Sequence, residues 1–179
     1  MGETAEADPS WSPDGRQLAF GSLAGNQEAG TTAERVIQLV DLASGRVTSL
    51  PGSGSFFSPR WSPDGRSIVA LSVDSSRLVI FDIASQRWSD LVPPGISYGW
   101  PNWSADSTAV TFLRDVFREK VFLRVRIADH KVDTILKGEG ANLVFGALGP
   151  WFGWTQDGSP MVLLDAGTHD IYALDWDAP

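Results

Sequence analysis

The chain has no cysteine, only two histidines and no apolar run of the roughly 18 to 20 residues that a bilayer requires. Without cysteine, neither a disulfide nor a thiolate-ligated metal site can form. Basic residues are also scarce, since fourteen Lys and Arg residues stand against twenty-two Asp and Glu residues, for a formal charge of -8. Acidic surfaces repel phosphate backbones, and scattered basic residues supply little counterion release. We therefore expect no nucleic-acid binding and no membrane span in this segment.

The residues that are abundant indicate short strands joined by tight turns. Eight Trp, eighteen Gly and eleven Pro occur in 179 residues, and 42% of the chain is apolar, enough for a packed core. Glycine and proline interrupt helices but suit turns. The composition therefore predicts an all-β protein.

A motif of the form WSPDG occurs four times. The tryptophans that begin it are 50, 42 and 51 residues apart, at Trp11, Trp61, Trp103 and Trp154. A second repeated stretch, of which LVIFDIASQR is one copy, adds another hairpin to each repeat. This period is typical of the antiparallel four-stranded blades of a β-propeller.

The repeats divide the chain into one propeller domain of about four blades. The predicted parts are a tail at 1–7, blades at 8–57, 58–99 and 100–150, and a partial fourth blade at 151–179 without its outer strand. Because such a segment leaves its end blades unpaired, we expect an open arc cut from a larger ring. Exposed apolar faces and strand edges favour association, so self-association through the end blades is also expected.

The second strand of each repeat is apolar at nearly every position, as in SIVALS at 67–72. Strands of a sheet with one solvent-exposed face would alternate apolar and polar residues. Both faces of these strands are therefore expected to be buried. Blades stacked around a channel meet this condition, which favours a propeller over a β-sandwich. The repeated tryptophan is expected to pack on the neighbouring blade, and SPDG at 62–65 to form a type I turn followed by a bulge.

At WSPDGRQLAF and WSPDGRSIVAL the sequence resembles the WD40-like (PD40) repeats of TolB-type propellers, which also occur in prolyl oligopeptidases and tricorn-like proteases. The resemblance covers about residues 8–176. It implies the propeller fold and favours a periplasmic or other extracytoplasmic location, but its members include scaffolds, sensors and peptidase gates. The ending IYALDWDAP also resembles the C-terminus of bacterial proteins that join a winged-helix regulator to such a propeller.

No catalytic, metal or cofactor site is predicted from the residues. The motif aspartates recur in the same turn of every repeat, which indicates a structural role, at Asp14, Asp64, Asp106 and Asp157. The string GSGSF at 52–56 lacks the GxSxG spacing of a nucleophile elbow. Both histidines, His130 and His169, fall in predicted loops of different repeats.

Two connections are longer than their counterparts, namely LAGNQEAGTTAER at 23–35 and GEGANLVFGALGPWFG at 138–153. In an up-and-down blade both emerge on one face, because the second strand ends on the side where the first begins. Aromatic residues precede the inner strands on that face, which makes it the predicted partner-binding face. The candidate binding residues are Phe56, Tyr98, Trp100, Phe145, Trp151 and Phe152.

The predicted function is a non-enzymatic protein-interaction or scaffold/sensor module that binds a protein or peptide through this face. One alternative is a sensor that binds a small molecule or carbohydrate on its aromatic residues. A second is the propeller of a peptidase whose catalytic domain is not part of this sequence.

Overall fold

The computed structural model describes residues 5–23, 36–114, 119–138, 143–146, 149–150, 152–155, 160–165 and 167. It consists of an N-terminal unit, Met1–Glu139, and a C-terminal unit, Gly140–Pro179. No helix occurs among the described residues, and none of their segments could cross a membrane as a helix.

The N-terminal unit contains three antiparallel sheets, each of four strands in chain order, which we call blades 1 to 3. Blade 1 is formed by β1 (Ala5–Trp11), β2 (Gln17–Leu23), β3 (Gln38–Asp41) and β4 (Val47–Ser49). Blade 2 is formed by β5 (Phe56–Trp61), β6 (Ser67–Ser72), β7 (Leu78–Asp82) and β8 (Arg87–Asp90). Blade 3 is formed by β9 (Gly99–Trp103), β10 (Ala109–Arg114), β11 (Val121–Arg126) and β12 (Val132–Lys137).

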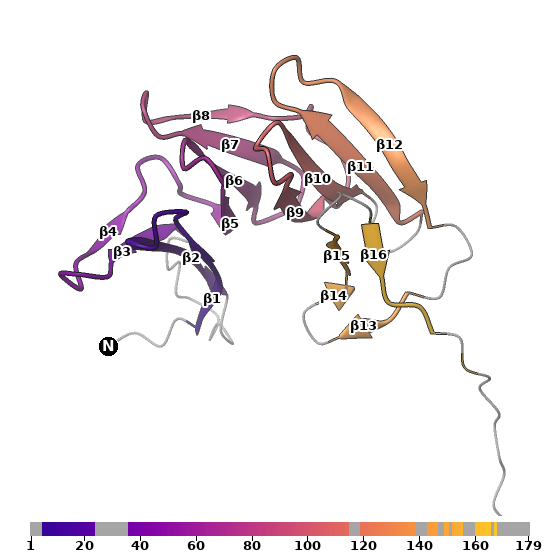
Figure 1. Cartoon of the computed structure of the whole chain (residues 1–179), viewed down its shortest axis with the longest axis horizontal. Helices are drawn as coiled ribbons and strands as arrows, with labels where there is room; N and C mark the ends of the chain where they lie inside the picture. The colour runs from indigo at the N-terminus through magenta and orange to yellow at the C-terminus, as the bar shows by residue number, and fades with distance from the viewer. Residues whose placement is uncertain are drawn as a thin grey trace, which may run out of the picture. The chain divides into compact units, whose positions relative to one another are not determined.

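In each blade the first strand is innermost and the fourth lies at the outer edge (Figure 1). This confirms the predicted all-β class and the up-and-down blades. The inner strands begin at Ala5, Phe56 and Gly99, up to three residues before the boundaries expected from the repeats.

The C-terminal unit holds two short hairpins among its described residues. They are formed by β13 (Phe145–Gly146) with β14 (Gly149–Pro150), and by β15 (Phe152–Trp154) with β16 (Pro160–Val162). The first hairpin lies inside the segment 138–153, which sequence reasoning treated as a loop. In the second, Trp154 pairs with Pro160, one residue closer along the chain than in the pair Trp11 and Leu18. The predicted third strand of this repeat lies outside the described residues.

The centre of the N-terminal unit is β6, whose two faces belong to two different cores. Ile68 and Ala70 pack in the core shared with blade 1, and Val69 and Leu71 in the core shared with blade 3. Successive side chains of a strand point to opposite faces, so an uninterrupted apolar run supplies both cores. The two-sided burial inferred from SIVALS is therefore present in the structure.

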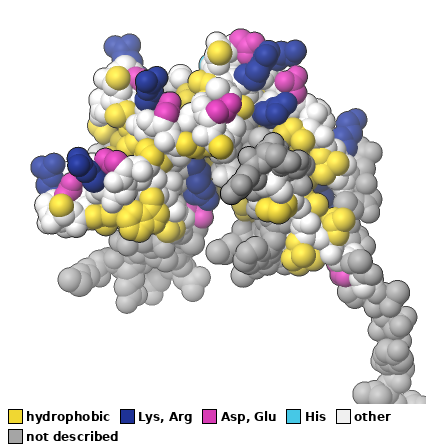
Figure 2. Space-filling model, in the orientation of Figure 1, with side chains coloured by type: hydrophobic (Ala, Val, Ile, Leu, Met, Phe, Trp, Pro, Cys, Tyr) yellow, Lys and Arg dark blue, Asp and Glu magenta, His cyan; other side chains and the backbone are white. Residues whose placement is uncertain are grey.

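The repeated tryptophan packs on the preceding blade in blades 2 and 3. Trp61 joins the core between blades 1 and 2, and Trp103 joins the core between blades 2 and 3. The Trp103 indole Nε1 also donates a 2.9 Å hydrogen bond to the carbonyl of Arg60 in blade 2. Trp11 differs, because 60% of it is exposed. Hydrophobic side chains are visible at the surface of blade 1 (Figure 2).

A pair of substitutions on β6 tests whether both faces of the blade carry stability. Ile68→Ala and Leu71→Ala each remove a side chain that is almost fully buried, in opposite cores. Each is expected to cost about 2 to 5 kcal/mol of unfolding free energy. Ile96→Ala, at a side chain that is 75% exposed, is the control and should stay within about 0.5 kcal/mol. Urea denaturation followed by circular dichroism measures all three, and a neutral Leu71→Ala would contradict two-sided burial.

Candidate interaction face

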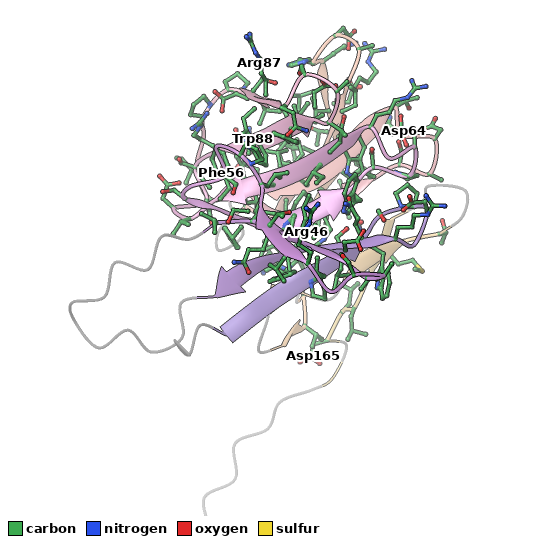
Figure 3. The ribbon with its side chains drawn as sticks, turned by 90° about the vertical axis from the view of Figure 1, so that its left-hand side faces the viewer. Arg46, Phe56, Asp64, Arg87, Trp88 and Asp165 are labelled. Carbon is green, nitrogen blue, oxygen red and sulfur yellow. The ribbon has the colours of Figure 1, made fainter. Side chains whose placement is uncertain are left out.

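The blades of the N-terminal unit have two kinds of strand ends. One side carries the turns that join the first strand to the second, at 12–16, 62–66 and 104–108, and we call it the turn face. The turns that join the third strand to the fourth lie on the same side. The opposite side carries the connections from the second strand to the third and from one blade to the next, whose described parts include 50–55, 73–77 and 91–98, and we call it the loop face. Figure 3 shows Phe56 and Trp88 close together, with Asp64 at the other end of blade 2.

The connection between β8 and β9 is fixed to the neighbouring turn of the same blade. Gly95 N donates to Ser76 O at 2.8 Å, and Tyr98 N donates to Ser75 O at 2.7 Å. The Tyr98 hydroxyl closes the loop by donating to Pro93 O at 2.9 Å. A side chain at Gly95 would collide with this hydroxyl, which accounts for glycine there. The loop is thereby held in one conformation, with Ile96 at its tip.

Ile96 is the most exposed large apolar side chain among the described residues, at 75%. The two prolines before it, Pro93 and Pro94, are exposed as well. Sequence reasoning missed Ile96 because it counted aromatic residues only. The available signal was a β-branched residue directly after Pro-Pro-Gly, where a turn normally carries polar residues.

The turn beneath this loop, Ser72 to Arg77, is held by a carboxylate. Asp74 Oδ1 accepts hydrogen bonds from the Ser72 hydroxyl and from Ser76 N, the latter at 3.0 Å. These donors lower the pKa of Asp74 to about 2, the Ser72 hydroxyl having the largest effect. Arg77 Nε donates to Asp90 at 2.8 Å, and its guanidinium lies 5.7 Å from the centre of the Phe56 ring. The loop face of blade 2 therefore has a rigid, charge-paired base.

Two of the predicted binding residues are buried. The Phe56 ring lies 4.8 Å from the Trp88 ring, in the core between blades 1 and 2. The Tyr98 ring meets Phe112 edge to face at 5.3 Å, in the core between blades 2 and 3. In this structure both rings pack between blades, so partner contact through them would require their exposure.

Trp100 is half-buried and has a left-handed backbone, with φ of 48°. The same position three residues before the repeated tryptophan is Asp8 in blade 1 and Ser58 in blade 2, with φ of 55° and 54°. Each inner strand has an irregular register here, and a proline follows in every case. A bulky residue with positive φ is uncommon, whereas Asp tolerates it. Trp100 is thus held at a bulge position that suits small polar residues.

The remaining predicted binding residues belong to the C-terminal unit. Trp151 and the side chains of Phe145 and Phe152 lie outside the described residues. The same holds for Asp157 and His169, and for the long connection at 24–35.

The motif aspartates of the turn face have the structural role expected of them. Asp64 Oδ1 accepts from the Ser62 hydroxyl at 2.6 Å and from Arg66 N at 3.0 Å, and Asp14 and Asp106 make the equivalent bonds. These donors, the serine hydroxyl first, hold the pKa of each carboxyl below its usual range, and that of Asp106 at about 2. Because the carboxylates are satisfied locally, they are poor proton donors near neutral pH.

In blade 3 the turn has Ala105 and Ser107 where the motif has proline and glycine. It still forms, with Ser107 N donating to Ser104 O at 3.0 Å and Ser107 at φ of 59°. The Ser107 hydroxyl also accepts from Asp64 N at 3.0 Å, which links the turns of blades 2 and 3. Glycine has no hydroxyl group and could not accept this hydrogen bond.

The depressed pKa values make stability sensitive to acid. A carboxyl whose folded pKa is about 2, against 3.8 without such donors, stabilises the fold above pH 4 and loses that contribution as pH falls towards 2. The urea midpoint is therefore expected to fall between about pH 4 and about pH 2. Asp74→Asn and Asp106→Asn should each flatten this dependence, while Asp133→Asn serves as the control. A midpoint that fell equally steeply in all variants would contradict this assignment.

No cluster of three or more His, Asp or Glu side chains suited to a metal ion occurs in the part of the chain that the structure describes.

No protein-family model and no curated protein matches the chain. Several solved structures are similar to the chain. TolB from Acinetobacter baumannii is similar with a TM-score of 0.63 and 18% identity, over 87% of this chain and 36% of that one. A putative TolB from Agrobacterium tumefaciens has a TM-score of 0.62 and 21% identity, over 87% of this chain and 56% of that one. The β-propeller domain of the Trilobed protease from Pyrococcus furiosus has a TM-score of 0.60 and 14% identity, over 89% of this chain and 57% of that one.

These similarities and the repeated blades define the class: the chain is a β-propeller segment. More particularly, it has the TolB-like form of the fold, as the WSPDG repeats led us to expect. The chain spans between about a third and somewhat over half of the length of these similar structures. The predicted winged-helix fusion is not tested by any of them and stays a prediction.

Proposed function

We propose that the chain is a non-enzymatic interaction module that binds a protein or peptide through the loop face of its N-terminal unit. The observation that carries the proposal is the loop 91–98, which presents Ile96 while its backbone is fixed to the turn at 73–77. A rigid loop loses little conformational entropy on binding, so an apolar side chain at its tip contributes most of its burial to affinity. Apolar anchors of this kind, surrounded by polar groups, are typical of protein interfaces.

Two features favour this proposal over the alternatives. Carbohydrate binding by stacking needs exposed aromatic faces, whereas Phe56 and Tyr98 of the loop face are buried between blades. Acid or base catalysis needs carboxyls with a pKa near neutral, whereas those of Asp14, Asp64 and Asp106 are lowered by turn hydrogen bonds. The similarity to a protease propeller domain is one of fold, at 14% identity, and does not argue for peptidase activity here.

A charge introduced at the loop tip tests the proposal. A photo-crosslinking amino acid at position 96 should capture a discrete protein from a native extract, identified by mass spectrometry. With that protein purified, Ile96→Asp is expected to weaken binding about tenfold or more, because a carboxylate would enter an apolar contact. Stability should not change, since Ile96 is mostly exposed.

The matched control is Leu136→Asp, at an exposed apolar residue of the outer strand β12. It should leave binding unchanged. Equal loss in both variants, or capture from position 136 but not from position 96, would place the interface elsewhere. Specific binding of oligosaccharides that Ile96→Asp abolishes would replace the proposal by the carbohydrate alternative.

A further inference from the structure

One face of the blade 1 sheet carries apolar side chains that are exposed in the described part of the chain. Three of its large apolar side chains are strongly exposed: Trp11 by 60%, Leu42 by 42% and Val47 by 51%. Leu18 and Val40, which pair across the sheet, lie between them in register and are partly exposed. Large apolar groups gathered on one sheet face indicate an interaction surface.

The repeats show what covers this face in the other blades. By register, Trp11, Leu42 and Val47 correspond to Trp61, Ile83 and Trp88 in blade 2. All three of the blade 2 residues pack into the core shared with blade 1. In blade 3 the equivalent Trp103 and Ile127 pack into the core shared with blade 2. On both blades, therefore, the occupant of this face is another propeller blade.

The polar contacts of these two interfaces are also specific to a blade. Trp103 Nε1 donates to the inner-strand carbonyl of Arg60, whereas the buried Trp61 Nε1 has no hydrogen-bond partner among the described residues. The backbone N–H of Trp61 donates to the Ser10 hydroxyl at 2.9 Å. Arg60 in turn lies 3.4 Å from the carboxylate of Asp8 in blade 1. A partner for Trp11 must therefore offer an apolar sheet face, as blade 1 does for Trp61 and blade 2 for Trp103.

The chain carries a second exposed apolar strand that suits this requirement. In the C-terminal unit Met161, Leu163 and Leu164, in and directly after β16, are each 51% exposed. They belong to the second strand of the fourth repeat, the strand whose counterpart β6 supplies both cores of blade 2. Two copies related by a two-fold axis can bury both surfaces of both chains at once.

We propose that the Trp11 face of blade 1 docks onto the exposed apolar residues in and directly after β16 of a second copy of this chain. The contact repeats the blade-on-blade packing within the chain. Since each copy has a formal charge of -8, moderate salt should strengthen the dimer by screening repulsion.

Sedimentation velocity of the full chain at concentrations up to about 100 µM tests the proposal. The wild-type chain is expected to form a dimer whose fraction rises with concentration and with salt. The double substitution Leu42→Asp with Val47→Asp should weaken the dimer by about a hundredfold or more, because it places two carboxylates in an apolar contact. Met161→Asp should weaken it comparably from the other side of the interface.

The control is Val132→Asp with Leu136→Asp, which changes two equally apolar, exposed residues on the outer strand of blade 3. It should leave the dimer intact, as should Ile96→Asp on the loop face. Urea denaturation at low concentration establishes that every variant folds. A wild-type chain that stays monomeric at the highest concentration overturns the proposal. A dimer weakened equally by the control also overturns it.

Discussion

The structure depends on one constraint: the second strands of the blades are apolar on both faces, so a blade gains stability from each neighbour that packs on it. In β6 the constraint is visible within four residues, because Ile68 and Ala70 enter one core while Val69 and Leu71 enter the other. Stability therefore passes from blade to blade, as in other repeat proteins. Trp61 and Trp103 extend this contact, whereas Trp11 is 60% exposed in the described part of the chain.

Polar chemistry is confined to the strand ends, and there it serves the backbone. The same arrangement, a serine hydroxyl and a backbone N–H donated to one aspartate oxygen, forms the turns at Asp14, Asp64 and Asp106 and recurs at Asp74 on the opposite face. A carboxylate used in this way stabilises its turn and has little capacity left for chemistry. What Asp74 contributes to function is indirect, because the turn it fixes supports the loop that presents Ile96.

The sequence predicts the fold well and the interaction site poorly, for a physical reason. Blade architecture depends on signals that repeat, namely the tryptophan spacing, the SPDG turns and strands without polar alternation, and each copy supports the others. The direction of a single side chain has no such redundancy. Phe56 and Tyr98 stand next to or within loops in the sequence, yet both rings pack in the cores between blades. Ile96, in contrast, is exposed only because hydrogen bonds of its neighbours fix the loop outward, which the residue pattern does not reveal.

The loop face and the Trp11 face are physically independent surfaces of the same blades. The first is built from strand ends and connections, the second from side chains that project from a sheet, so a change on one need not disturb the other. Packing of blade on blade keeps the loop sides of blades 1 to 3 together, since the equivalent turns at 12–16, 62–66 and 104–108 share the opposite face.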